Sequence, residues 1–488
     1  MAMGSGVQIA VFVAITALIG LLTWLKVRSG QSEHDGSGKD VFLAGGGLTW
    51  PYIAGSITLT NLSTEQLVGM NGNQMLLLAW WEIAGFFGLL ILAFAFVPVY
   101  YRNNCTTVTE LLERRYGGAS IRTVISALFL IGSVLIYLPA ALYSGSLFLK
   151  SMFGVEWPLW WFAAPMAIIA ALYTITGGLR SVAVMDTFSG VGVLGIALLI
   201  VVLALAAVDW DLFSGVPIER ITMIGAEDSP IPFSTLFTGM LFIQIFYWST
   251  NQNITQKAMT APTVREAQKG VLAAAFIRIM IIPAIVVIPG VAAYKMFGDA
   301  GDLTYGRVVA EVLPGWLSGA FAALMAAAVI AHTSAILNGT VALYSVDFHD
   351  KFIRKVEDHW RLAAIVSMIL TVTSILLVPI FQNAESIINL LQQLNGLTSM
   401  PILSAFIVGL LFRNVGAQAA IAGVVWGVLF YAAFTFWWQP AGLITLHYIH
   451  FMTIVLATSV AMALIWNRAM LGKSAQWVGL ADITGKTK

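Results

Sequence analysis

Two short stretches gather side chains that can bind a polar solute, within a chain that is otherwise apolar. The first holds Thr58, Thr60, Asn61, Ser63, Thr64, Glu65 and Gln66. The second holds Tyr247, Trp248, Ser249, Thr250, Asn251, Gln252 and Asn253 in succession. Their amides, hydroxyls and carboxylate can exchange hydrogen bonds with solute hydroxyls. Such residues cannot face lipid, so each stretch must line a cavity or be unwound inside protein, unless both serve as hydrogen-bonding contacts between helices.

Five ionisable residues also fall inside or just within apolar runs: Glu65, Glu82, Asp186, Arg278 and His332. A charge near the bilayer centre costs at least a few kcal/mol, which makes each a candidate for function. Glu82 follows Trp80 and Trp81, and a carboxylate beside ring faces suits the hydroxyls and CH face of a sugar. The alternative is an interfacial aromatic belt beside a structural carboxylate. Arg278 is too costly unpaired, so we expect it to meet Glu82 or another acid.

His332 and Asp186 are both expected in the cytoplasmic half of the membrane. A histidine beside an aspartate can load and release a proton near physiological pH. The alternative is a histidine that donates to a backbone carbonyl. Gln392, Gln393 and Asn395 present another polar face toward the same cavity.

The rest of the composition shows which kind of chain carries these residues. Hydrophobic residues make up 59% of the 488 positions and charged residues 10%, with a mean hydropathy of +0.86. These values predict an all-α integral membrane protein with the lipid bilayer as its partner. A net charge of +1 without a basic stripe argues against nucleic acid. The single cysteine excludes an intrachain disulfide, and we expect no cofactor beyond a coupling ion.

A bilayer core needs about 20 apolar residues per helix, and the chain offers about thirteen such spans. They lie at approximately 8–26, 49–72, 75–100, 123–149, 157–176, 182–207, 234–256, 270–294, 312–344, 362–381, 384–411, 415–437 and 447–467. The first is read as a retained helix, because no basic residue precedes it. An N-terminus outside and a C-terminus in the cytoplasm put 20 of the 25 Lys and Arg residues on the inner side and four on the outer. We therefore predict this orientation in the plasma or inner membrane.

The two polar stretches stand five spans apart and so run in opposite directions through the membrane. Discontinuous helices in corresponding positions are typical of a transporter built as an inverted repeat of five plus five helices. We predict a leading helix and linker over 1–48 and a transport core over 49–411, with repeats at about 49–207 and 234–411. Two accessory helices and a tail follow over 412–488.

Three motifs in order, TNLSTEQLVGMNG, YTITGGLRS and TNQNITQKAMTAPTVREAQKG, resemble the solute:sodium symporter family, especially its bacterial sugar transporters. The likeness covers nearly the whole chain. It implies a LeuT-like fold and symport of a small neutral sugar with a cation by alternating access. We expect the chain to function as a monomer.

The resemblance also implies a substrate site. Five side chains would bond the sugar hydroxyls: Gln66, Glu82, Gln244, Arg278 and Gln392. Asn61 would support them, and Tyr247 would close over the sugar from the inner side. The family's galactose transporters have lysine in place of Arg278, asparagine in place of Gln244 and serine in place of Gly85. The transported sugar can therefore differ.

The implied sodium site departs further from the family. Its backbone carbonyls would come from Leu59, Leu62 and Ala328, and its two hydroxyl positions hold Ala331 and His332. Alanine offers no oxygen ligand and imidazole is a poor ligand for a hard cation. Asp186 and Ser334 match other cation-site positions of the family, but these two residues alone supply too few oxygen ligands for a sodium ion. We therefore predict a degenerate sodium site and coupling to protons through His332 assisted by Asp186. Sodium coupling through a modified site and cation-independent facilitated transport are the alternatives.

Other classes of protein find less support. A channel would show rings or a repeated filter motif, and an enzyme would need a nucleophile with a base or clustered metal ligands. We predict no enzyme activity. A sugar sensor that keeps the binding site and loses coupling is a further alternative, and an organic acid or a polyol is the alternative solute.

Overall fold

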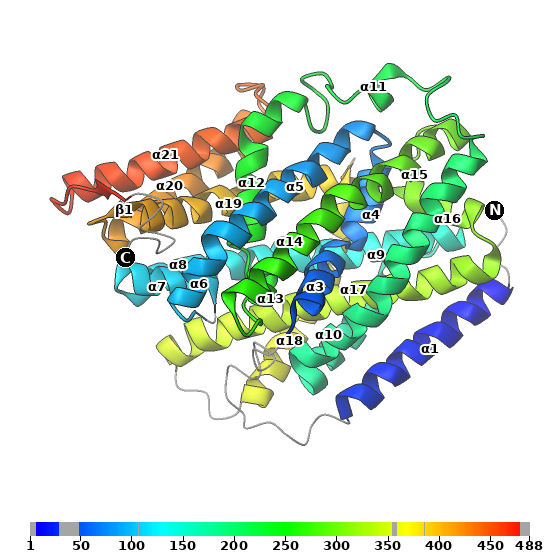
Figure 1. The fold of residues 1–488 in the computed structure, drawn as a ribbon, viewed down its shortest axis with the longest axis horizontal. Coiled ribbons are helices and arrows are strands. Elements are labelled where there is room, and N and C mark those ends of the chain that lie inside the picture. Colours follow the sequence, from blue (N-terminus) through cyan, green and yellow to red (C-terminus); the bar gives the residue numbers. More distant parts are fainter. Residues whose placement is uncertain (1–5, 29–47, 106, 354–358, 385, 479–488) are drawn as a thin grey trace.

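The computed structural model describes residues 6–28, 48–105, 107–353, 359–384 and 386–478, which form a bundle of helices (Figure 1). The first part contains α1 (Gly6–Arg28), α3 (Trp50–Asn61), α4 (Thr64–Gly72), η3 (Leu76–Leu78), α5 (Ala79–Ile91), η4 (Leu92–Phe96), α6 (Val97–Arg102), α7 (Val108–Tyr116), α8 (Ala119–Gly132), η5 (Ser133–Tyr137), α9 (Leu138–Phe153) and α10 (Trp160–Ala207). The middle contains α11 (Ile218–Ile221), η6 (Phe233–Phe237), α12 (Gly239–Ser249), α13 (Gln252–Ala258), α14 (Val264–Met280), α15 (Ile282–Phe297), η7 (Gly301–Leu303), α16 (Thr304–Val312), α17 (Gly315–Leu343) and η8 (Tyr344–Ile353).

The last part contains α18 (His359–Leu377), η9 (Val378–Asn383), α19 (Ile387–Leu411), β1 (Phe412–Arg413), α20 (Ala417–Ala433), η10 (Phe434–Trp438), α21 (Tyr448–Ala469) and β2 (Gln476–Trp477). The two short strands pair antiparallel, with Phe412 opposite Trp477. In Figure 1, α1 and α21 lie at opposite edges of the bundle.

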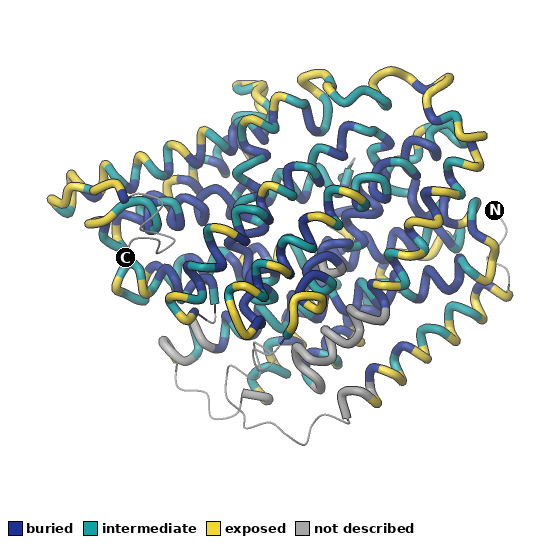
Figure 2. The backbone as a smooth tube through the Cα atoms, in the orientation of Figure 1, coloured by how far each residue is buried: buried dark blue, intermediate teal, exposed yellow. Residues whose placement is uncertain are grey.

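The described helices have the lengths and surfaces of a multi-pass membrane protein. Ten helical stretches within the described residues are long and apolar enough to cross a membrane. Figure 2 shows buried backbone through the centre and many exposed residues along α1 and α21. The exposed side chains of α1 include Val7, Val13 and Leu21. Apolar side chains on the outside of the bundle can face lipid, whereas the helices satisfy their own backbone groups.

One predicted boundary is absent. The expected spans 157–176 and 182–207 lie in a single helix, α10, which runs for 48 residues. The glycines of the TITGGLRS segment disfavour helix by only about 1 kcal/mol each and carry backbone N–H groups, so they do not have to end it. Both halves pack on α17: Thr174 Oγ1 donates to the Ser334 carbonyl at 3.3 Å, and Gly192 lies against Leu324. The count of thirteen spans stays a prediction.

Both predicted helix breaks are confirmed. Between α3 and α4, Leu62 and Ser63 leave helical geometry, and the Ser63 hydroxyl caps α4 by accepting from the Gln66 N–H at 3.4 Å. Between α12 and α13, the Asn251 side chain caps α13 by accepting from the Asn253 N–H at 2.9 Å. Serine and asparagine are favoured at this position because their oxygens satisfy free N–H groups of the first turn. Each break therefore starts a second, separately capped half-helix.

Two nine-residue helices, α7 and α16, were not predicted. Each follows the long helical stretch that comes after a broken helix, at Leu76–Arg102 and at Val264–Phe297. The nine-residue α7 carries two arginines, so it is too short and too polar to be predicted as a membrane span. It nevertheless joins the core, because its Val108 N–H donates to Gln252 Oε1 at 2.9 Å and the Tyr116 hydroxyl donates to the Ala405 carbonyl at 2.8 Å. Helix α7 thereby connects α13, which contains Gln252, to α19, which contains Ala405.

A buried asparagine attaches α4 to α15. Pro289 lies inside α15 and has no N–H, so it cannot bond the carbonyl of Ile285 one turn earlier. Asn71 Nδ2 donates to that carbonyl at 3.2 Å, and Asn71 Oδ1 accepts from the Gly290 N–H at 2.8 Å. A Cβ on Gly290 would lie 2.5 Å from the Asn71 carbonyl oxygen, so only glycine permits this approach. The proline and the asparagine thus complement each other across two helices.

The C-terminal end of α4 is held by other elements as well. Arg220 Nη1 donates to the Asn73 carbonyl at 2.8 Å. Asp302 Oδ2 accepts from the Ile387 N–H at the start of α19 at 2.8 Å. Asp302 also packs against Gly72, where an added Cβ would lie 2.7 Å from Asp302 Oδ1. Burial raises the pKa of the Asp302 carboxyl to about 7, and its bond from Ile387 opposes the shift. This end of α4 therefore contacts α11, η7 and α19.

We predict that Asn71→Ala destabilises the protein by about 2–4 kcal/mol, because the Ile285 carbonyl and the Gly290 N–H lose a buried partner. Cys105 offers the measurement, since it is the single cysteine and is 7% exposed. Burial raises the pKa of its thiol to about 12, so the folded protein holds little reactive thiolate. A thiol-reactive fluorophore should report thermal unfolding in detergent.

Asn103→Ala is the matched control for this experiment. Its amide donates to the Val99 carbonyl of its own turn at 2.8 Å, and within the described part of the chain it bonds to no second helix. Equal unfolding temperatures for the two variants would contradict the role given to Asn71.

Candidate functional site

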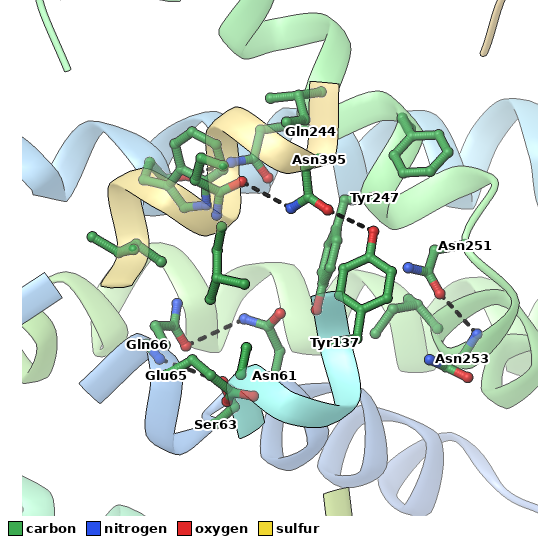
Figure 3. A pocket seen from close by; sticks show the side chains of 18 of the residues that line it. Asn61, Ser63, Glu65, Gln66, Tyr137, Gln244, Tyr247, Asn251, Asn253 and Asn395 are labelled. Atoms are coloured by element: carbon green, nitrogen blue, oxygen red, sulfur yellow. Dashed lines mark hydrogen bonds between the residues drawn. The ribbon is translucent and has the colours of Figure 1, made fainter. Parts of the chain in front are cut away.

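A cavity of about 120 Å³ lies beside both helix breaks (Figure 3). Polar side chains from seven segments line it together with apolar ones: Asn61, Ser63, Glu65 and Gln66 around the first break, Tyr137 from η5, Gln244 and Tyr247 from α12, Asn251 and Asn253 around the second break, Arg278 from α14, His332 from α17, and Gln392 and Asn395 from α19. The two polar stretches, distant in sequence, thus surround one space.

A fully buried ion pair forms one wall of the site. Arg278 Nη2 lies 2.5 Å from Glu82 Oε2, with the two side chains 6% and 0% exposed. Gln66 Nε2 donates to the other oxygen of Glu82. The guanidinium carbon of Arg278 lies 4.4 Å from the ring centroid of Trp248, so the cation also rests on an aromatic face. The expectation that Arg278 is paired is confirmed, and of the acids left open by the sequence its partner is Glu82.

Glu82 itself does not line the cavity in this structure. Its carboxylate lies behind Gln66 and Arg278, which do line it. Direct contact between Glu82 and a solute stays a prediction that would require these two side chains to move. In the present arrangement Glu82 holds and neutralises Arg278 and accepts a hydrogen bond from Gln66, both of which line the cavity.

Asn61 links this wall to the second broken helix. With its oxygen facing Arg278, the amide accepts from Nη1 at 2.5 Å and donates to the Tyr247 hydroxyl at 2.9 Å. The opposite orientation, drawn in Figure 3, gives one donation to Gln66 Oε1 at 3.4 Å. We prefer the first orientation, because amide oxygen and nitrogen are assigned from their partners and it satisfies both. Asn61 therefore supports the site from beside the first break.

Two further amide groups are already held by neighbours. Gln244 Nε2 donates to the Trp81 carbonyl at 3.0 Å and its oxygen accepts from Trp248 Nε1 at 2.9 Å. Asn395 donates to Gln392 Oε1 at 3.2 Å and accepts from the Tyr137 hydroxyl at 2.5 Å, as Figure 3 shows for the latter pair. These bonds fix the amide planes that face the cavity.

The second ionisable pair lies at the start of α4. Glu65 Oε1 is 3.6 Å from His332 Nε2, with side-chain exposures of 11% and 22%. His332 Nδ1 is buried and has no hydrogen-bond partner within the described part of the chain. The pair connects α4 with α17 directly at the cavity. The side chain of Asp186, the predicted partner of His332, lies outside the described residues.

The implied cation-site positions are placed around the same break. Leu62 is buried and its N–H donates to the Thr58 carbonyl at 3.1 Å, and the side chain of Leu59 lies outside the described residues. On α17, Ala331 is fully buried and Ala328 is partly buried. The Ser334 hydroxyl donates to the Ala170 carbonyl at 2.8 Å, so it joins α17 to α10.

Sequence reasoning missed several residues of the site. Tyr137 stands alone in an apolar run and gave no periodic signal. Trp248, Asn251 and Asn253 were noted only as part of a polar stretch, without individual roles. Glu65 was singled out as a buried charge, but its contact with His332 depends on how α4 and α17 pack.

A bundle of apolar helices with two broken members around a polar cavity defines a membrane transporter rather than an enzyme. The model of the sodium:solute symporter family matches residues 41–427. An uncharacterized symporter, YidK of Escherichia coli strain K12, is 33% identical over 88% of this chain and 78% of its own. The sodium/glucose cotransporter of Vibrio parahaemolyticus is 28% identical over 86% and 83%.

The fold has a close counterpart among solved structures. A Na⁺-coupled sialic acid symporter in its substrate-bound outward-open state has a TM-score of 0.79 at 18% identity, over 97% of this chain and 99% of that one. The fold is therefore LeuT-like, as predicted. The chain belongs to the sodium:solute symporter family and is a cation-coupled symporter of a small solute.

We predict that Glu82→Ala destabilises the protein by about 3–5 kcal/mol, because it leaves the Arg278 cation buried without its partner. Cys105 labelling during heating in detergent measures the change. Glu156→Ala is the control, since Glu156 is 95% exposed and lies 3.9 Å from Lys150, so its loss should change the unfolding temperature little. An unchanged unfolding temperature for Glu82→Ala would show that the pair is not needed for stability.

Proposed function

We propose that this symporter imports a monosaccharide or a similar neutral polyol together with a proton. The solute would occupy the cavity between the two helix breaks and contact Asn61, Gln66, Gln244, Arg278 and Gln392, with Tyr247 closing it on the inner side. Amide-rich walls support this class of solute, because each amide both donates and accepts, as hydroxyl groups do. The glucose-carrying relative from Vibrio parahaemolyticus supports it as well.

The charges around the cavity also favour an uncharged solute. Arg278 is neutralised by Glu82, so it offers no free positive charge to an anion. The remaining carboxylate, on Glu65, would repel a negative solute. A neutral polyol is therefore favoured over a sugar acid.

The Glu65–His332 pair is the observation that carries proton coupling. Alanine and histidine occupy the positions where the family resemblance implies hydroxyl ligands for sodium, and alanine cannot bind a hard cation. Protonated His332 would form an ion pair with Glu65 across α4 and α17, and neutral His332 would not. Protonation at this place would thus change the attraction between the half-helix after the first break and α17.

The substrate class can be tested by counterflow in proteoliposomes loaded with D-glucose, D-galactose, myo-inositol or N-acetylneuraminate. We expect a neutral sugar or polyol to exchange with its labelled form and the anionic sugar not to exchange. Gln66→Ala should lower the exchange about tenfold or more, the effect of losing roughly 1.4 kcal/mol of hydrogen bonding. Gln268→Ala is the control, since its amide donates to the Ala93 carbonyl at 3.0 Å, outside the cavity. Exchange of the anion alone would refute the proposed solute class.

The coupling ion is tested with imposed gradients in the same vesicles. An inward pH gradient without sodium should drive accumulation, and His332→Ala should abolish accumulation while exchange continues, because the variant binds solute but carries no proton. His450→Ala is the control, since that histidine contacts Thr238 and Ser234 near the start of α12. Accumulation driven by sodium at fixed pH, with no effect of a pH gradient, would contradict proton coupling. Exchange that no gradient can drive uphill would identify a facilitator, and an absence of flux with retained binding would identify a sensor.

A further inference from the structure

Gly85 lies where Arg278 passes closest to α5. A Cβ added to Gly85 would be 2.5 Å from Arg278 Nε and 3.3 Å from Arg278 Cδ. It would also lie 3.2 Å from Trp248 Nε1. The arginine side chain therefore occupies the space that a side chain at position 85 would need.

The guanidinium group has little freedom to leave this space. One edge meets Glu82 at 2.5 Å, its carbon rests on the Trp248 ring at 4.4 Å, and Asn61 accepts from Nη1 at 2.5 Å. Because the group is planar, Nε cannot shift without turning the whole fork away from at least one of these partners. Nε is itself buried and has no hydrogen-bond partner among the described residues. It packs against Gly85 instead.

We propose that Gly85 is a positioning residue for Arg278, and that the two act as one unit that sets the width of the solute cavity. Because Gly85 has no side chain, the guanidinium can lie against α5 and pair with the buried Glu82. In this position the guanidinium leaves the centre of the cavity open. Any side chain at position 85 moves the guanidinium toward the cavity and loosens its pairing with Glu82. In a space of about 120 Å³ such a displacement removes a large share of the room for a solute.

The unit can be tested without knowing the solute, by a double-mutant cycle on stability. Gly85→Ala should lower the unfolding temperature measured by Cys105 labelling, although alanine favours helix over glycine by about 1 kcal/mol. Arg278→Lys keeps the charge but has no planar fork, so its stem can move aside. The Gly85→Ala/Arg278→Lys variant should therefore unfold at a temperature higher than the sum of the two single effects predicts. Additive effects would overturn the proposal, and so would a Gly85→Ala variant as stable as the unchanged protein.

Gly88→Ala is the matched control from the same helix. Its Cβ would meet the Gln244 carbonyl oxygen at 2.6 Å and Trp248 Cδ1 at 2.7 Å, and its three nearest atoms do not include Arg278. We expect Gly88→Ala to destabilise the protein with no rescue by Arg278→Lys. Rescue of both glycine variants by Arg278→Lys would mean that lysine acts generally on the packing of α5 and not through Gly85.

A transport measurement tests the effect on the cavity, and this part rests on the proposed function. For D-glucose, or the panel solute that exchanges fastest, Gly85→Ala should raise KM about tenfold, and Arg278→Lys should recover most of that loss in the double variant. An unchanged KM with the predicted stability cycle would overturn the role in cavity width but keep the packing unit. If no panel solute exchanges in the unchanged protein, the proposed function fails while the stability cycle still decides on Gly85 and Arg278.

Discussion

The buried Glu82–Arg278 ion pair constrains most of the structure around it. Removing two charges from water costs several kcal/mol each, and only close contact and additional hydrogen bonds offset that cost. Glu82 is completely buried and Arg278 nearly so, and Gln66, Asn61 and Trp248 each contribute a bond or a ring face to the pair. These partners come from α5, α14, α12 and the segments on both sides of the first break. The charge pair therefore needs these elements in one arrangement, and glycine at position 85 gives the arginine room to take part.

The same requirement connects the two broken helices. Asn61 ends α3 and touches both Arg278 and Tyr247, so the ion pair reaches from the first break to the second. The capped starts of α4 and α13 leave the chain free to change direction at both places. The cavity forms between them because polar groups that cannot face lipid have to face one another. Amides are the most frequent polar side chains in its wall, and neighbouring side chains hold several of them in one orientation, which fits the proposed recognition of hydroxyl groups.

Glu65 and His332 form a weaker and more accessible contact than the central pair. Their atoms are 3.6 Å apart, and His332 keeps 22% of its side chain exposed. A central pair of permanent charges and a peripheral pair with a titratable member suit different tasks. The first holds the side chains of the cavity wall together. On the proposed function, this separation lets α4 respond to a proton without loss of the solute-binding side chains.

From the amino-acid sequence we could predict the membrane class, the positions of the two helix breaks and the residues that had to lie in the interior. Hydropathy, capping residues and the cost of buried charge are local properties that can be read along the chain, and the resemblance to a family added the order of the helices. Which side chains meet depends on how the helices pack, and the sequence did not predict it. The tertiary structure paired Arg278 with Glu82 rather than with another acid, placed Glu82 behind the cavity wall, brought Glu65 to His332 and added Tyr137 to the site. It also showed that α10 is continuous where two spans were predicted, and that Asn71 bonds to the Ile285 carbonyl, which Pro289 cannot bond. Such contacts depend on the rotation and crossing of helices far apart in sequence, and the apolar pattern of a single helix does not encode them.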